Sequence, residues 1–524
     1  MYSLLENRLS RLATGADPSF FAGSKTGLEK ESLRVNPEGS ISQTPHPSVL
    51  GSALTNPYIT TDYSEALIEF ITPPFARSEE SLQFLQDTQQ FVYSRLDNEL
   101  LWATSMPCVV AGETSIPIAQ YGSSNAGLMK TVYRRGLGHR YGRVMQVIAG
   151  VHYNYSFADT FWPVYQEQEK DSRLLQTFIS KSYFALIRNL QRYGWLIPYL
   201  FGASPAVCKS FLGGQPTTLK DFDDNTYYEP FATSLRMGDI GYQNNKENET
   251  GVNICYDSLE NYIKSLASSI DTPCPEYEKI GVKVNGEYRQ LNANILQIEN
   301  EYYSTIRPKQ VLSNNEKPTL ALKKRGIRYV ELRSLDVNAF EPLGIGTEQL
   351  YFLEILMTFC LLQDSPQVST LERKEINHNE IFTAHHGRDP SLQLQRNGDI
   401  QSLKSWAQEL CEQMTGVSEF LDTVNNNKYY TRALKAQMEV VADPDRTPSA
   451  IMLDEMRKEK EGFYHYAKRM SEKHHRYFRS LSENKDRTGF FIDAASESLE
   501  KQRAIEAADS MTFEQYLQNY FSQT

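Results

Sequence analysis

Six side chains in this chain are of the types that bind a divalent cation. They are the carboxylates Glu29, Glu31, Asp62, Glu69 and Glu331 and the imidazole of His152. Charged groups removed from water must be paired or bound to metal, so five carboxylates in one pocket would repel one another strongly without cations. Carboxylate oxygens with one imidazole suit Mg2+ or Mn2+, whereas zinc favours cysteine or several histidines. The residue types therefore predict a magnesium site, with Mn2+ as the alternative ion.

Most of these residues lie in short stretches where polar and apolar residues alternate, as is typical of strands. Side chains two apart in an extended segment share a face. The pattern therefore places Glu29 with Glu31, Glu65 with Glu69, His152 with Asn154 and Ser156, and Glu331 with Arg333. We expect four antiparallel strands that turn one polar face towards a common cleft. For a single glutamate, the competing interpretation is a solvated residue on an exposed strand face. For His152 alone, it is a buried histidine in the core. Four stretches that all separate polar from apolar side chains in the same way favour the metal site.

Composition and charge exclude some classes of protein. The 524 residues carry a formal net charge of -11, which disfavours binding to nucleic acid, because such proteins usually have a basic excess. The first twelve residues include Glu6, Arg8 and Arg11 and lack the apolar core of a signal peptide. The longest apolar run, 351–362, contains Glu354 and is too short to span a bilayer. We therefore expect a cytoplasmic protein without a nucleic-acid or membrane partner, and nothing indicates its oligomeric state.

The cysteines do not form a recognisable pattern. They are Cys108, Cys208, Cys255, Cys274, Cys360 and Cys411, and no two of them form a Cys-x-x-Cys pair. In a cytoplasmic chain of this length, such spacing predicts reduced thiols in structural positions rather than disulfides.

Helical patterns connect and follow the predicted strands. Ser78-Glu79-Glu80 is typical of a helix N-cap with an acidic first turn, and a second helical stripe runs from about Leu175 to Tyr193. From about Asp364 onward, charged helical patterns dominate. Two pairs of adjacent histidines lie in this region, at 385–386 and 474–475, and we expect them at the surface or in loops. The chain is predicted to be α+β, with a catalytic core over 1–362 and a helical C-terminal extension over 363–524 packed on the same unit.

A nucleotide, if one is used, has to be held without a glycine-rich phosphate loop. The Walker A pattern is absent, and Gly344-Ile345-Gly346 has Gln349 where a third glycine would be needed. Basic residues are the alternative; they are Arg307 and Lys309, the run 323–325, and Arg333. Arg134 and Arg236 have the planar fork that recognises carboxylates, although surface ion pairs are the competing interpretation for both.

Eight segments together resemble the bacterial glutamate-cysteine ligase family, also called γ-glutamylcysteine synthetase. They are GLEKESLRV (27–35), TTDYSEALIEFITP (60–73), AQYGSSN (119–125), VHYNYS (151–156), PYLFGASPAVC (198–208), ATSLRMGDIGY (232–242), QIENEYYSTIRPK (297–309) and VELRSLDVN (330–338). The resemblance extends from about residue 23 to 362, and the six acidic and histidine positions fall where the family has its metal ligands.

The resemblance implies a fold and an activity. The fold would be glutamine-synthetase-like, with a curved antiparallel sheet that forms a cup and helices packed outside it. The activity would be the ATP-dependent joining of L-glutamate to L-cysteine, through a γ-glutamyl phosphate, as the first step towards glutathione. ATP, L-glutamate and L-cysteine would then be the small-molecule partners, and Mg2+ the cofactor.

The resemblance also implies roles for substrate-binding residues. Tyr133, Arg134 and Tyr242 would meet cysteine, Arg236 would meet a substrate carboxylate, and Tyr63, Leu137 and Gln146 would shape the thiol pocket. Our mechanistic hypothesis adds Arg333, which would neutralise the transferring phosphoryl group, and Arg307 and Lys309, which would contact the polyphosphate. The alternatives are a ligase for a different amine, a non-catalytic ion-binding protein and a metal-dependent phosphohydrolase.

Overall fold

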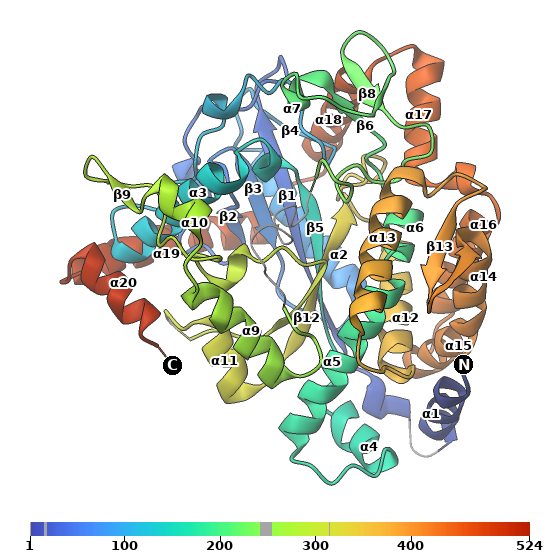
Figure 1. Cartoon of the computed structure of the whole chain (residues 1–524). Coiled ribbons are helices and arrows are strands. Elements are labelled where there is room, and N and C mark those ends of the chain that lie inside the picture. Colours follow the sequence, from blue (N-terminus) through green and yellow to red (C-terminus); the bar gives the residue numbers. More distant parts are fainter. Residues whose placement is uncertain (1, 15–17, 242–253, 314, 524) are drawn as a thin grey trace.

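A seven-stranded antiparallel sheet lies at the centre of the molecule (Figure 1). The computed structural model describes residues 2–14, 18–241, 254–313 and 315–523. The strand order is β11-β12-β5-β1-β3-β2, and β4 pairs with the end of β1. The bounds are β1 Lys25–Val35, β2 Ile59–Thr61, β3 Leu67–Ile71, β4 Leu100–Leu101, β5 Gly150–Ser156, β11 Ile306–Lys309 and β12 Tyr329–Asp336. The predicted antiparallel sheet is confirmed.

The register of this sheet brings the polar residues of four strands onto one face. Glu29 of β1 pairs with His152 of β5, and Glu31 pairs with Glu69 of β3. Glu331 of β12 pairs with Asn154 of β5. Residues directly opposite each other in an antiparallel pair share a face, so these side chains project to the same side, which we call the acidic face.

The opposite face of the sheet packs against helices. Leu28, Tyr153 and Leu332 lie there and are buried. Helices α2 (Ser78–Tyr93), α5 (Leu175–Tyr193) and α6 (Leu196–Phe201) contact β1, β11 and β12 respectively, and α12 (Thr347–Leu362) packs against α2 and α5. Both helices expected from the sequence are confirmed, although the N-cap of α2 is Arg77 and not Ser78.

One predicted strand begins later than expected. Glu65 precedes β3 and lies in the turn between β2 and β3, where its carboxylate accepts hydrogen bonds from the backbone N–H groups of His46 (2.9 Å) and Gln120 (2.7 Å). The expectation that Glu65 and Glu69 share a strand face was therefore wrong. Asp62 lies in the same turn and keeps its place beside the acidic face.

Further helices and strands lie among the described residues of the N-terminal two thirds. The helices are α1 Ser3–Thr14, α3 Asn125–Tyr141, α4 Phe161–Gln168, α7 Lys209–Leu212, α9 Leu259–Asp271, α10 Pro275–Ile280 and α11 Pro318–Arg325. The strands are β6 Ala206–Cys208, β7 Lys220–Asp221, β8 Thr226–Tyr228, β9 Lys283–Val284 and β10 Glu287–Tyr288. Within the described residues, no helix combines the length and the apolar character needed to span a bilayer.

Two cysteines expected to be reduced form a disulfide. The sulfur atoms of Cys108 and Cys208 are 2.26 Å apart, although 100 residues separate them in the sequence. The fold places β6 beside the segment that contains Cys108, and Val110 N–H donates to Ser210 Oγ at 3.4 Å in the same region. Their spacing gave no sign of this contact because tertiary packing alone creates it. Cys255, Cys274, Cys360 and Cys411 are free thiols, as expected.

The C-terminal third is mainly helical and contacts the sheet unit at several places (Figure 1). Its elements are α13 Thr370–His386, β13 Gln393–Arg396, β14 Asp399–Ser402, α14 Leu403–Gln413, α15 Thr415–Asn425, α16 Tyr429–Ala442, α17 Pro448–Glu459, α18 Phe463–Ser480, α19 Lys485–Ala508 and α20 Phe513–Phe521. Helix α16 packs on α12, and α18 and α19 pack on α2. A single hydrophobic core includes residues from both parts of the chain, and the domain boundary at residue 362 stays a prediction.

Residues near the C-terminus hold the first turn of α3. Asp509, just after α19, accepts hydrogen bonds from the backbone N–H of Asn125 (2.5 Å) and from its side-chain amide (3.1 Å). The same amide donates to the Met511 carbonyl at 3.0 Å. The start of α3 is therefore fixed by residues from the other end of the chain.

The histidine pairs of this region lie on helices, and one member of each pair is buried. His385 of α13 and His474 of α18 are 8 % and 4 % exposed. Burial and the positive charge of Lys30 lower the pKa of His474 to about 3. The expectation of surface or loop positions was wrong for these two, because packing partners distant in the sequence cover them.

Candidate active site

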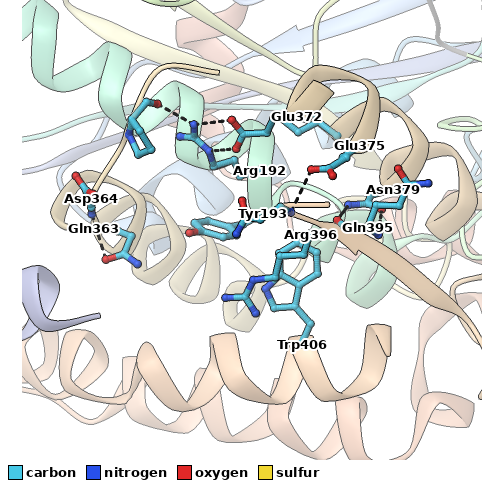
Figure 2. A pocket seen from close by; sticks show the side chains of 13 residues that line it. Arg192, Tyr193, Gln363, Asp364, Glu372, Glu375, Asn379, Gln395, Arg396 and Trp406 are labelled. Carbon is cyan, nitrogen blue, oxygen red and sulfur yellow. Dashed lines mark hydrogen bonds and ion pairs between the residues drawn. The ribbon is translucent and has the colours of Figure 1, made fainter. Parts of the chain in front are cut away.

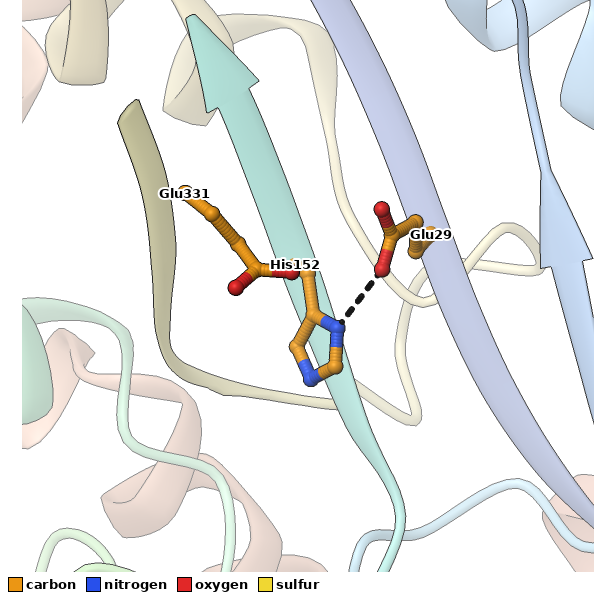
Figure 3. A group of neighbouring side chains, drawn as sticks. All are labelled: Glu29, His152 and Glu331. Carbon is orange, nitrogen blue, oxygen red and sulfur yellow. Dashed lines mark hydrogen bonds and ion pairs between the residues drawn. The ribbon is translucent and has the colours of Figure 1, made fainter. Parts of the chain in front are cut away.

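Three side chains from adjacent strands converge at the centre of the acidic face. Figure 3 shows Glu29, His152 and Glu331, whose potential ligand atoms lie within 4.8 Å of one another. His152 Nδ1 is 3.0 Å from Glu29 Oε2, and the Asn154 amide donates to Glu29 Oε1 at 2.9 Å. The β1, β5 and β12 backbones set these positions, because neighbouring strands lie about 4.8 Å apart.

A second group shares the same histidine. Glu31, Glu69 and His152 also offer ligand atoms within 4.8 Å of one another. His152 Nε2 is 3.6 Å from Glu31 Oε1, and Glu31 Oε2 accepts a hydrogen bond from the Gly150 N–H at 2.6 Å. Asp62 is near enough for its charge to affect Glu31 and Glu69. All six predicted ligands therefore lie on or beside one face.

The carboxylates of this cluster perturb one another. Burial and the charges of Glu29, Asp62 and Glu31 raise the pKa of Glu69 well above its usual range. Burial also raises the pKa of Glu31, and His152 offsets this only in part. Burial disfavours the ionised form of Glu331 too, but Lys309 and Arg333 outweigh it and hold the pKa of Glu331 low. The cluster thus contains more negative charge than its neighbours neutralise.

The donor set fits a hard divalent cation. Glu331 is 1 % exposed, and its Oε2 atom is buried without a hydrogen-bond partner among the described residues. An ionised oxygen in that position is costly unless a cation meets it. Carboxylate oxygens that converge with a single imidazole are the ligand type of Mg2+ or Mn2+.

Cationic side chains border the cluster on the β11 and β12 side. Arg333 Nη1 is 3.3 Å from Glu331 Oε1, and Lys309 Nζ is 3.2 Å from the same oxygen. Arg307 pairs with Glu331 in the β11–β12 register, and its guanidinium donates to the backbone carbonyls of Asn300 (3.1 Å) and Tyr302. The three predicted phosphate-binding residues therefore lie together at one edge of the acidic face.

Arg236 lies against the sheet from a separate segment. Its Nη2 donates to the Arg333 carbonyl at 2.8 Å, and its Nη1 is 3.8 Å from Asp336 Oδ1. A Cβ at position 150 would be 2.2 Å from Arg236 Nη2, so only glycine allows the guanidinium to approach the start of β5. The predicted carboxylate-binding arginine is thus placed beside Glu31 and Arg333. Its positive charge opposes the rise that burial causes in the pKa of Glu31.

Helix α3 places further predicted residues beside the Asp62 turn. Arg134 Nε donates to the Asp62 carbonyl, and its guanidinium lies 4.6 Å from the Tyr121 ring centroid. Among the described residues no carboxylate lies within ion-pair distance of Arg134, so its charge stays available to an anionic ligand. Tyr133 contacts the 297–301 segment through its carbonyl, which accepts from the Gln297 amide at 3.2 Å.

The predicted thiol-pocket residues are buried near the same helix. Tyr63 is 1 % exposed, and its hydroxyl is buried without a partner among the described residues. It approaches Gly138 so closely that a Cβ there would be 2.5 Å from the hydroxyl oxygen. Leu137 is buried on α3, and the Gln146 carbonyl oxygen accepts from Tyr303 at 2.7 Å. Tyr242 lies outside the described residues.

Sequence reasoning missed two buried residues that support the site. Asp336, at the end of β12, accepts from Ser204 (2.6 Å), Ser234 (2.9 Å) and the Ala203 N–H (2.8 Å). Glu301 forms a buried ion pair with Arg140 of α3 at 2.8 Å. Both lie in segments that resemble the family, but a carboxylate in a strand or loop gives no local sign of its distant partner.

A hollow of about 210 Å³ elsewhere in the molecule is a poor candidate for the same chemistry (Figure 2). It lies among α5, α13, β13 and α14, and its arginines are already paired: Arg192 with Glu372 at 2.5 Å, and Arg396 with Glu409 at 2.8 Å. None of the predicted site residues is among those that line it. The acidic face therefore remains the candidate active site.

Comparisons with known proteins identify the family of this chain. The family model for glutamate-cysteine ligase matches residues 9–382. The chain is 48 % identical over 523 residues to a glutamate–cysteine ligase of Alcanivorax borkumensis, with 99 % of each chain covered. It is 46 % identical to one of Pseudomonas paraeruginosa, with 99 % of this chain and 98 % of that protein covered.

Solved structures give the same result. The fold is similar to that of a Francisella tularensis glutamate–cysteine ligase in complex with AMP, with a TM-score of 0.89, 34 % identity, and coverage of 95 % of this chain and 98 % of that one. A bifunctional glutathione synthetase of Pasteurella multocida shares the fold at a TM-score of 0.69 and 23 % identity, with 90 % of this chain and 54 % of that one covered. The family model, the full-length relatives named glutamate–cysteine ligase and the similar solved structure all agree. This chain belongs to the glutamate-cysteine ligase family.

Proposed function

We propose that this chain joins the γ-carboxylate of L-glutamate to the amine of L-cysteine with ATP, the first step of glutathione synthesis. The observation that carries the proposal is the strand face on which Glu29, His152 and Glu331 lie beside Arg333. Family membership supports the two amino acids as substrates, and the AMP complex of the Francisella tularensis enzyme supports ATP as co-substrate. The cytoplasmic location, the lack of a nucleic-acid partner and the oligomeric state stay predictions.

The proposed cofactor is Mg2+, held by Glu29, Glu31, Asp62, Glu69, His152 and Glu331. Ions of this kind neutralise phosphate oxygens and hold them in a fixed orientation. The raised pKa of Glu69 and the unpartnered Oε2 of Glu331 support a cation at this place.

The reaction needs two transfers because a carboxylate is a poor acyl donor. An oxygen of the γ-carboxylate attacks the terminal phosphorus of ATP, the bond to the bridging oxygen breaks, and ADP and γ-glutamyl phosphate form. The free amine of cysteine then attacks the acyl carbon, phosphate leaves, and the nitrogen loses a proton as the amide forms. In phosphoryl transfer, positioning and charge neutralisation carry most of the catalysis.

The residues at the edge of the acidic face have the charge for these steps. Arg333 would neutralise the transferring phosphoryl group, and Lys309 and Arg307 would contact the polyphosphate. Their common approach to Glu331 from β11 and β12 supports this division of roles.

Two arginines are the proposed carboxylate-binding residues: Arg134 beside the Asp62 turn and Arg236 beside β12. Arg134 would bind the cysteine carboxylate beside Tyr133 and Tyr242, and its lack of a carboxylate partner among the described residues supports this role. Arg236 would bind a second substrate carboxylate. Tyr63, Leu137 and Gln146 would shape the thiol pocket, whose discrimination against one extra methylene is worth about 1 to 3 kcal/mol.

Phosphate release tests the proposal against its alternatives. Purified protein is given ATP, Mg2+ and L-glutamate, with L-cysteine or one of a panel of other amines. We expect phosphate release only with both amino acids, together with γ-glutamylcysteine in equal amount. Release without an amine would identify a phosphohydrolase, release with another amine a different ligase, and no turnover an ion-binding protein.

Glu331→Gln tests whether the acidic face is the site of this reaction. We expect the variant to lose activity and to need more Mg2+ for what remains, because an amide is a weak ligand for a hard cation. Glu287→Gln is the matched control, since Glu287 is exposed on β10 and should be dispensable. Equal turnover in the two variants would remove Glu331 from the site.

A further inference from the structure

One histidine of the C-terminal third bridges both ends of the segment that carries Arg236. His385 Nδ1 is 2.9 Å from Glu229 Oε2, and its Nε2 is 3.0 Å from Asp239 Oδ1. Each ring nitrogen faces a carboxylate, and Nε2 also lies 3.3 Å from the backbone nitrogen of Asp239. Both ring nitrogens can donate to the carboxylates only when the ring is protonated. Burial lowers the pKa of His385, but the two carboxylates outweigh it and raise the pKa to about 9. A charged imidazole therefore ties position 229 to position 239.

The end of α13 also holds this segment through its backbone. The Ala384 carbonyl accepts from the N–H groups of Thr233 (2.9 Å) and Ser234 (3.1 Å). A Cβ at Gly238 would be 2.5 Å from His385 Nε2. The imidazole thus packs directly against the backbone two residues after Arg236.

The other side of the segment is fixed by the catalytic sheet. Asp336 of β12 accepts from Ser234 at 2.9 Å, and Arg236 Nη2 donates to the Arg333 carbonyl at 2.8 Å. The Arg236 guanidinium therefore has its place set from two directions. Contacts to β12 orient the guanidinium group, and His385 holds the backbone segment from which the side chain extends.

We propose that His385 is a positioning residue of the ligase: it bridges Glu229 and Asp239 and thereby places Arg236 for its substrate carboxylate. The inference rests on the proposed function of Arg236. If His385 has this role, helix α13 of the C-terminal third contributes to substrate recognition. A misplacement of about 1 Å can cost about a hundredfold in rate, so a residue that never touches substrate can still control its binding.

The test measures kcat and the KM for ATP, glutamate and cysteine in His385→Gln, whose single side-chain NH2 group cannot take the place of both ring nitrogens. We expect the KM of one amino acid to rise about tenfold, as for loss of a well-placed charged hydrogen bond, with the KM for ATP unchanged. A merely structural loss would lower the active fraction, and hence kcat, without this selective change. His386→Gln is the matched control, because His386 is the exposed neighbour on the same helix.

Arg236→Lys separates failure of the inference from failure of the proposed function. If Arg236→Lys raises the KM of one amino acid and His385→Gln raises the same one, the inference is supported. If only Arg236→Lys has this effect, His385 is not a positioning residue and the proposed role of Arg236 stands. If neither variant changes an amino-acid KM, both statements are wrong.

A second variant covers the case in which His385→Gln does not fold. Asp239→Asn weakens the same bridge at a side chain that is 66 % exposed, so the fold should tolerate it. We expect the same selective rise in KM, of smaller size. Thermal unfolding shows whether the Asp239→Asn variant is folded. If it is folded and its KM values equal those of the parent, the inference is wrong.

Discussion

Two groups of buried charge lie near helix α3, and they differ in how completely their charges are neutralised. Arg140 and Glu301 form an ion pair in which both side chains are fully buried. The remaining groups of this pair are satisfied: Glu301 accepts from the Gln297 N–H (2.7 Å), and Arg140 donates to Gln290 (2.9 Å). On the acidic face, by contrast, burial and neighbouring carboxylates raise the pKa values of Glu31 and Glu69, so the charge of the cluster is only partly neutralised.

The difference separates structural charge from functional charge. A buried pair with all its hydrogen bonds made stabilises one conformation, and here it fixes α3 against the 290–301 segment. An unbalanced cluster costs folding free energy, and it persists because a ligand compensates it. Charge balance, rather than burial, therefore distinguishes the candidate site from the structural pair.

The largest effect on stability is expected from breaking the balanced pair. Glu301→Gln leaves the Arg140 guanidinium buried without a counter-charge, which should lower the free energy of unfolding by about 3 to 5 kcal/mol. Urea denaturation of the variant and the parent measures this. A loss below about 1 kcal/mol would mean that Arg140 finds another partner.

The largest effect on catalysis is expected from the edge of the acidic face. Arg333→Ala should lower kcat about a hundredfold, because charge on the transferring phosphoryl group is no longer neutralised, and it should raise the KM for ATP less. Steady-state kinetics with saturating amino acids provides both constants. The reverse pattern would assign Arg333 to ground-state binding of the nucleotide.

The unbalanced cluster should also respond to the ion itself. At a concentration of about a hundred times its dissociation constant, Mg2+ should stabilise the parent by about 2.7 kcal/mol. Glu69→Gln should shrink this gain, and without Mg2+ it should be at least as stable as the parent, since it removes a repelled carboxylate. Thermal unfolding with and without Mg2+ measures both, and a variant that loses stability without Mg2+ would contradict the comparison.

The smallest effect concerns the pH dependence of the bridge at His385. Because the folded state raises the pKa of this histidine from 6.5 to about 9, its stabilisation is complete below pH 6.5 and is lost as the pH rises through about 9. The groups that face it are Glu229 and Asp239, with His386 beside it on α13. We expect a decline on the order of 1 to 2 kcal/mol over this range.

His385→Gln is the variant that tests the pH dependence. Urea denaturation between pH 6 and 10 should give a flatter stability profile for this variant than for the parent. Identical profiles in the two proteins would show that the imidazole does not carry the effect.

Much of the sheet could be predicted because alternation is a local property. Glu29, Glu31, His152 and Glu331 each share a strand with apolar neighbours of opposite phase, so their common face followed from the residues alone. Glu65 did not follow, because the turn before β3 is held by long-range contacts, among them Ser64 Oγ to the Pro117 carbonyl at 2.7 Å. A period of two in the sequence does not reveal where the chain stops being extended.

The rest of the site depends on contacts between distant segments. His385 was expected at the surface or in a loop because nothing near it in the sequence indicates its partners Glu229 and Asp239, which lie about 150 residues away. The disulfide between Cys108 and Cys208 has the same origin. The roles assigned to Tyr133, Arg134 and Tyr242 came from resemblance, since isolated arginines and tyrosines do not indicate their ligands.

The hydrogen bonds from Asn125 to Asp509 have a consequence for how the enzyme matures. Domains begin to fold while the ribosome is still adding residues, yet the first turn of the helix that bears Arg134 is held by a residue 384 positions later in the sequence. A nascent chain would therefore contain all six predicted metal ligands well before helix α3, which carries Arg134, could be fixed in place. The proposed cysteine-binding residues of this helix would therefore reach their final positions only after Asp509 has been synthesised.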